Sequence, residues 1–93
     1  MLAEESIFSD LKKIMAELLK RDLAEIENLA TTASNLRDDL GIDSVESLDF
    51  LYALENQYSV EIRDNEVEAI KTVRDVIDLI VKKVNGKKLS EEK

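Results

Sequence analysis

The stretch LGIDSVESLDFLYALENQYSVEI, residues 40–62, contains the strongest indications of the fold. Asp43 is followed three residues later by Glu46, which is the spacing of a capping box at the start of a helix. Apolar residues then recur at helical spacing, and no glycine or proline interrupts them. This pattern predicts a long helix over residues 44–58, with Ser44 as its first residue.

The composition of the 93-residue chain favours a single small helical domain. Hydrophobic residues make up 44% of the chain, which suffices for one core built from aliphatic side chains but not for two. There is no proline and there are only two glycines, whereas a β-sandwich needs a turn signal about every 8–12 residues. We therefore expect an all-α fold, a small four-helix bundle with three long helices and one short one, within a single domain of residues 1–86.

Before residue 44, the sequence predicts one long helix and one long loop. Ile7 and Leu11 begin a stripe of apolar residues at helical spacing, which predicts a helix over about residues 5–20. The periodicity weakens over residues 21–43, where turn-forming residues are frequent. We expect a long loop between the first two long helices, held to the core by its aliphatic side chains, with a short helical turn near residues 35–40.

After residue 58, a short helix and a final long helix are expected. The short helix should cover about residues 65–70. The final helix should open at Thr72, because Thr72 and Asp75 have capping-box spacing. Gly86 is placed to end this helix, and residues 87–93 are expected to form a disordered tail.

Neither histidine nor cysteine occurs in the chain, and their absence excludes several kinds of chemistry. Disulfides and the common Cys/His zinc sites are impossible. The commonest general base near neutral pH and the thiol nucleophile are missing, and Ser44 lies in no Gly-x-Ser-x-Gly motif. Three neighbouring acids, Asp38, Asp39 and Asp43, lack the ligand spacing of a calcium-binding loop. We therefore expect no catalytic activity of the chain's own and no specific metal site.

The sequence also indicates where such a protein would work. The stretch MLAEESIFSDLKK, residues 1–13, has acids where a secretory signal has a basic start. No apolar run reaches the length of a transmembrane helix. We expect a cytoplasmic monomer without stable membrane insertion.

The negative charge is concentrated in one part of the chain. The formal net charge is −8, and seven of the 21 acids lie between Asp38 and Ile62, where there is no Lys or Arg. The rest of the chain holds 14 acids and 13 bases and is nearly neutral. The block could be only a solvated acidic face, but it makes nucleic acid an unfavourable partner and basic protein surfaces favourable ones.

The apolar residues of the helix over residues 44–58 cover more than one face. Some of them face the expected core: Phe50, Leu51, Leu54 and Tyr58. A second group forms what we call the apolar ridge: Val45, Leu48 and Tyr52. Three acids border this ridge: Glu46, Asp49 and Glu55. Because a carboxylate within a buried stripe is unfavourable, Glu55 should be exposed and the ridge should be a docking surface. The alternative is that the ridge is core beneath the long loop.

The quoted stretch resembles the core of an acyl carrier protein, and the similarity covers about residues 7–84. It includes LGIDS, the helix ending in ALENQY, the EIxD step and the closing TVxDVIDLI. The resemblance implies that Ser44 carries 4′-phosphopantetheine and that Asp43 contacts the phosphopantetheinyl transferase that installs it. Arg63 departs from the pattern, because it stands where the family often has a proline.

The resemblance also assigns roles to the other residues of this region. The apolar ridge and its three bordering acids would be the recognition surface for the transferase and for acyl-chain synthases and transferases with basic docking patches. Four apolar residues of the interior would shelter the acyl chain: Phe50, Leu54, Ile62 and Ile70. The expected function is to hold acyl intermediates as thioesters for enzymes of the fatty-acid or polyketide type. The alternatives are a carrier of an amino acid or peptidyl load and an unmodified acidic helical adaptor that binds a basic partner.

Overall fold

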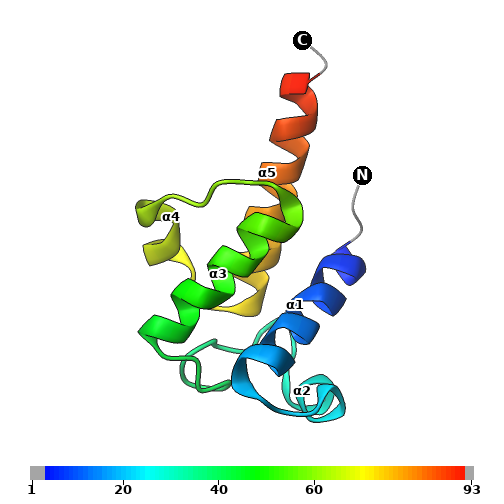
Figure 1. Ribbon diagram of the computed structural model, residues 1–93, viewed down its shortest axis with the longest axis vertical. Helices are drawn as coiled ribbons and strands as arrows, with labels where there is room; N and C mark the ends of the chain where they lie inside the picture. The colour runs from blue at the N-terminus through cyan, green and yellow to red at the C-terminus, as the bar shows by residue number, and fades with distance from the viewer. Residues whose placement is uncertain (1–3, 92–93) are drawn as a thin grey trace.

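The computed structural model of the protein describes residues 4–91, with side chains as far as residue 85. The described residues form five helices (Figure 1): α1 (Glu4–Leu19), α2 (Leu23–Leu29), α3 (Ser44–Tyr58), α4 (Asp64–Ala69) and α5 (Val73–Glu91). Within this range the only strand-like pairing is an isolated bridge between Asn35 and Thr72. The predicted small all-α bundle is confirmed, and its second long helix begins and ends at the predicted residues.

Helix α1 is the centre of the packing, because it contacts α2, α3 and α5. Three long helices supply most of the completely buried side chains of the core: Ile7, Leu11 and Met15 from α1, Phe50 and Leu54 from α3, and Val73, Val76, Ile77 and Ile80 from α5. These residues recur at intervals of three and four positions, as expected for helices that each bury one face. The bundle therefore has one aliphatic core with a single aromatic ring, Phe50, at its centre.

The segment expected to be a long loop contains an additional short helix, α2. Its sequence LAEIENL consists of good helix formers apart from one asparagine, and Ile26 is completely buried. A seven-residue helix is too short to be stable alone, and it depends on its packing against α1. Such a helix gives only about two turns of periodicity, which is why the sequence pattern did not reveal it.

Hydrogen bonds attach the rest of this segment to the start of α5. The Leu36 N–H donates to the Lys71 carbonyl at 2.9 Å, and the Val73 N–H donates to the Ser34 carbonyl at 3.0 Å. The turn expected near residues 35–40 is present, with the Asn35 side-chain oxygen accepting from two following backbone N–H groups. Residues 31–43 are thereby fixed beside the link between α4 and α5.

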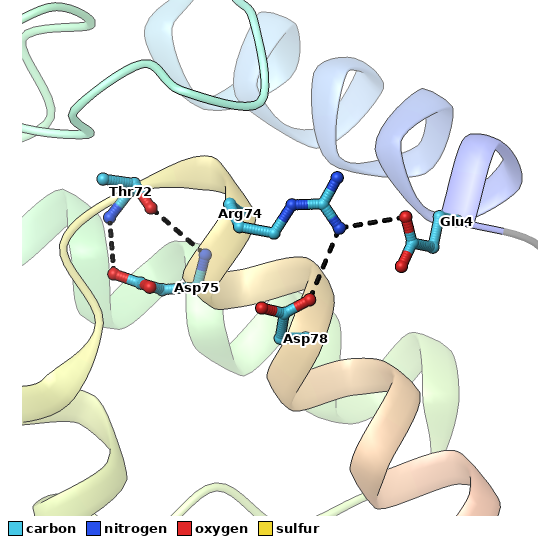
Figure 2. Close-up of polar contacts among 5 residues, drawn as sticks. All are labelled: Glu4, Thr72, Arg74, Asp75 and Asp78. Atoms are coloured by element: carbon cyan, nitrogen blue, oxygen red, sulfur yellow. Dashed lines mark hydrogen bonds and ion pairs between the residues drawn. The ribbon is translucent and has the colours of Figure 1, made fainter.

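Figure 2 shows how the start of α5 is held. The Thr72 N–H donates to the Asp75 carboxylate at 3.0 Å, and the Asp75 N–H donates to Thr72 Oγ1 at 3.2 Å, which confirms the predicted capping box. Arg74 Nη1 lies 2.9 Å from Glu4 Oε1 and 3.4 Å from Asp78 Oδ1. These contacts connect the first turn of α5 with the first turn of α1.

The predicted end of the last helix at Gly86 is wrong, because α5 continues to Glu91. The tail expected to be disordered is therefore helical over residues 87–91, and residues 92–93 lie outside the described part of the chain. A glycine inside a helix costs only about 1 kcal/mol relative to alanine, and no proline follows to stop the helix. The end of α5 extends beyond the other helices in Figure 1.

Candidate functional site

The start of α3 is fixed by a complete capping box. The Glu46 N–H donates to Asp43 Oδ1 at 2.8 Å, and the Asp43 N–H donates to Glu46 Oε1 at 3.1 Å. Just before it, Gly41 has a φ of 71°, a left-handed conformation that glycine adopts without strain. Ser44 follows as the first helical residue and is exposed. The local sequence thus presents the Ser44 hydroxyl at a rigid helix start.

Ser44 lines a cleft of about 630 Å³. Its walls are the 35–43 segment, the first half of α3, and the end of α4 with the link that follows it. Phe50 and Ile70, two of the four residues predicted to shelter an acyl chain, line this cleft. The other two do not: Leu54 is completely buried in the core, and Ile62 is half-buried against it. The cleft therefore connects an exposed hydroxyl with apolar side chains in the interior.

The apolar ridge lies on the surface. Val45 is 69% exposed, Leu48 50% and Tyr52 63%, and these are three of the four exposed large hydrophobic side chains among the described residues. The alternative interpretation of the ridge as core beneath the loop is wrong. Leu48 also lines the cleft, so the ridge and the cleft adjoin along α3.

The three acids that border the ridge differ in their surroundings. Asp49 is exposed. Glu46 is half-buried and belongs to the capping box. Glu55 is half-buried, and one of its carboxylate oxygens accepts a hydrogen bond of 2.7 Å from the Ile62 N–H. The prediction that Glu55 is exposed is wrong, because the chain turns back after α3, at Ser59 with a φ of 54°, and brings this backbone group to the carboxylate.

The sequence pattern missed two cations that line the same cleft as Ser44. Arg37 comes from the turn before α3, and Lys71 comes from the link between α4 and α5. Arg37 directly precedes the cation-free block, and Lys71 is 27 positions after the serine in the chain. The hydrogen bond between the Leu36 and Lys71 backbones holds the turn before α3 beside the link between α4 and α5. No local sequence pattern predicts this pairing.

Helix α4 forms one wall of the cleft and is held by polar contacts and by the half-buried Val67. None of its residues is fully buried. Glu66 Oε1 accepts from the Arg63 N–H at 2.9 Å and lies 2.7 Å from Lys83 Nζ on α5. The hydrogen bond with Lys83, followed by the one from the Arg63 backbone, lowers the pKa of Glu66. Arg63 has a φ of −86°, close to the range of proline, so its backbone conformation differs little from the one that a proline would impose.

Comparisons with known proteins define the family. The family described as "Phosphopantetheine attachment site" matches residues 9–80. The chain is 37% identical over 84 residues to an acyl carrier protein of Thermotoga maritima, an alignment that covers 90% of this chain and 99% of that protein.

Solved structures agree on the fold. A crystal structure of an acyl carrier protein from Thermotoga maritima superposes with a TM-score of 0.77 at 24% identity, covering 89% of this chain and 92% of that chain. The acyl carrier protein of Enterococcus faecalis superposes with a TM-score of 0.68 at 28% identity, covering 88% and 99%. The chain belongs to the acyl carrier protein family.

Membership supplies the cofactor and the general kind of partner. Proteins of this family carry 4′-phosphopantetheine and interact with phosphopantetheinyl transferases and acyl-processing enzymes. Within residues 4–91, no helix has both the length and the apolar character that a membrane span requires. The features found at the start of α3 fit the cofactor, since an exposed hydroxyl stands beside an apolar cleft.

Proposed function

We propose that Ser44 is the residue that carries the arm, and that the chain holds acyl groups on it for enzymes of the fatty-acid or polyketide type. The supporting observation is the position of Ser44, exposed at the start of α3 and lining the cleft. A phosphodiester there is favourably placed, because the first backbone N–H groups of a helix attract negative charge. The arm supplies the thiol that forms thioesters, which a chain without cysteine cannot do itself.

The cleft supports an acyl load. Its volume of about 630 Å³ is within the usual range of small-molecule sites, about 300–1,000 Å³. Phe50, Val67 and Ile70 give it apolar walls, and burial of an alkyl chain is favourable by about 0.8 kcal/mol for each CH₂ group. An amino-acid load would leave most of these walls unused. We therefore favour acyl groups over aminoacyl or peptidyl loads.

The apolar ridge is the proposed docking surface for partner enzymes. Its exposed aromatic and aliphatic side chains supply contacts that exclude water. Asp49 is exposed, so its carboxylate is available to attract basic patches. Glu55 is assigned to the fold instead, because its carboxylate binds the Ile62 N–H. Asp43 remains exposed while it caps α3, and we propose that it contacts the transferase.

The chain acts as a carrier without catalysis of its own, since its chemistry would lie in the arm and in the partner enzymes. We propose the cytoplasm as its location, where coenzyme A, the source of the arm, is available. In the transfer, Ser44 Oγ bonds to the phosphorus of the phosphopantetheinyl group, loses its proton and displaces 3′,5′-ADP.

Intact-mass spectrometry after incubation with coenzyme A and a promiscuous phosphopantetheinyl transferase tests the assignment. We expect one arm on the wild type and none on Ser44→Ala. Ser47→Ala is the matched control, because Ser47 lines the same cleft one turn later and should leave modification intact. Attachment to Ser47 or another serine would contradict the assignment of Ser44, and no attachment at all would favour the unmodified adaptor.

A further inference from the structure

Two cations from outside the acidic block line the same cleft as Ser44. Between Asp38 and Ile62 the chain has no Lys or Arg, so α3 itself offers no positive side chain to its first residue. Arg37 and Lys71 nevertheless line the cleft together with Ser44. They come from two different segments, which makes their meeting a property of the fold.

The backbone on both sides of the cleft is held in place. The Arg37 N–H donates to the Asn35 side-chain oxygen at 3.0 Å, and the Lys71 carbonyl accepts from the Leu36 N–H at 2.9 Å. The Lys71 N–H in turn donates to the Asp75 carboxylate at 2.9 Å. Both residues are therefore anchored through their backbones, while their side chains stay exposed.

Neither cation is paired with a carboxylate in the part of the chain whose side chains are described. Within residues 4–85 the ion pairs are made by Arg74 and Lys83, and none involves Arg37 or Lys71. Three acids, Asp38, Asp43 and Glu68, also line the cleft. A phosphodiester added to Ser44 would bring one more negative charge to this set, and nearby cations that turn toward it would offset the repulsion.

We propose that Arg37 and Lys71 form an anion site that binds the phosphodiester of the arm and directs the arm along the cleft. The inference rests on the proposed attachment at Ser44. Arg37 supplies a planar fork of donors suited to phosphate oxygens, and Lys71 supplies a flexible point charge. A carboxylate at the end of a load is the other anion that this pair could bind, and the experiment separates the two sources.

The test compares melting temperatures before and after attachment of the arm. For each variant, the attachment shift is the Tm of the unloaded holo-protein minus the Tm of the apo-protein, measured at low ionic strength. For Arg37→Gln/Lys71→Gln we expect this shift to be about 2–5 °C lower than in the wild type. The difference should disappear in about 0.5 M NaCl. The ³¹P resonance of the holo-protein should also move in this variant.

Lys13→Gln/Arg21→Gln is the matched control. It removes the same charge from exposed residues that do not line the cleft, so its attachment shift should equal that of the wild type. A second experiment loads the thiol of the arm with a succinyl or a butyryl group. Only the succinyl group carries a carboxylate. An effect that appears only with the succinyl load would overturn the assignment to the phosphodiester.

The outcomes keep this inference separate from the proposed function. Intact mass reports whether Ser44 is modified at all, and a wild type that accepts no arm contradicts the proposed function itself. Where the arm is attached but its shift is the same in wild type and in Arg37→Gln/Lys71→Gln, only the anion site is wrong. An equal change in the control variant would show a general charge effect and would also overturn the site.

Discussion

Helices α4 and α5 are neighbours in the chain, but they are held in different ways. The first half of α5 places four completely buried aliphatic side chains in the core. Helix α4 buries none of its residues and depends on the contacts of Glu66 with the Arg63 N–H and with Lys83. The Glu55 carboxylate, which binds the Ile62 N–H, holds the chain just before α4.

The difference teaches which part of the cleft can move. Elements with few buried contacts open locally at a small fraction of the global free energy of unfolding. Helix α4, with Val67 and the adjoining Ile70, forms a wall of the cleft, so this wall can open while the core stays folded. An acyl chain could then enter or leave the cleft without unfolding the bundle.

The largest contrast is expected from truncations in the two helices. Ile77→Ala on α5 leaves a cavity beside a completely buried site and should lower the free energy of unfolding by about 2–5 kcal/mol. Val67→Ala on α4 removes atoms from a half-buried position and should cost at most about 1 kcal/mol. Urea denaturation measures both values. Equal losses would show that α4 contributes to the core as much as α5 does.

A smaller loss is expected from the contact between α3 and α1. The Tyr58 hydroxyl donates to the Asp10 carboxylate at 2.6 Å, and Tyr58→Phe should lower the free energy of unfolding by about 1–2 kcal/mol. Burial, followed by the hydrogen bond to Asp10 and its charge, raises the pKa of Tyr58. The folded state therefore keeps the proton longer than the unfolded state, and this contribution is lost as the pH rises above about 10, the usual pKa of tyrosine.

Denaturation as a function of pH separates this contact from a general effect of alkali. Between about pH 10 and pH 12, the wild type should lose more stability than Tyr58→Phe. Tyr52→Phe, at an exposed position, serves as the control and should follow the wild type. If Tyr58→Phe lost stability as steeply as the wild type, the hydrogen bond to Asp10 would not be the cause.

Local signals predicted the long helices, apart from the end of α5, and the helix start at Ser44. Contacts distant in sequence account for most of the errors. The Asp43–Glu46 capping box fixed the start of α3, because both partners lie within one turn. Helix α2 was missed because its stability comes from Ile26 packing against α1. Glu55 was assigned to the surface because the Ile62 N–H that it binds belongs to a chain reversal that side-chain periodicity does not describe.

The site shows the same division. Helical periodicity alone separated the apolar ridge from the core face of α3, since exposure follows directly from angle around one helix. The cleft was predicted only in part, because its walls include segments separated by more than twenty residues along the chain. For this reason the sequence did not predict that Arg37 and Lys71 line the cleft, or that Leu54 and Ile62 lie outside it.

Breaking the ion pair of α4 should affect local opening more than global stability. Lys83→Met removes the partner 2.7 Å from Glu66, and an ion pair of this partial exposure contributes at most about 1 kcal/mol. Hydrogen exchange of the α4 amides should become several-fold faster, while the slowest amides of α5 change little. Lys82→Met is the control, because Lys82 is the exposed neighbour and has no ion pair within residues 4–85.

Acidic pH offers a second route to the same opening. The lowered pKa of Glu66 means that its contribution is present above about pH 4.3, the ordinary value, and is lost as the pH falls below it. As the pH decreases, hydrogen exchange of the α4 amides should therefore accelerate more in the wild type than in Lys83→Met, after correction for intrinsic rates. Exchange that is independent of both Lys83 and pH would show that the ion pair does not hold α4.

The smallest effect on stability is expected at the apolar ridge, where binding should change instead. Within residues 4–85, the exposed large hydrophobic side chains lie on α2 and α3, and none lies on α4 or on the part of α5 before residue 86. Tyr52 is 63% exposed and does not line the cleft, so Tyr52→Ala should change the free energy of unfolding by no more than about 0.5 kcal/mol.

If the ridge docks partners, Tyr52→Ala should weaken the free energy of binding by about 1–2 kcal/mol, mainly by faster dissociation. Leu29→Ala on α2 is the matched control, because Leu29 is an exposed apolar residue that does not line the cleft of Ser44. Binding kinetics with the transferase or a β-ketoacyl synthase measure both variants, and equal losses would show that exposed apolar area in general, rather than the ridge, contacts the partner.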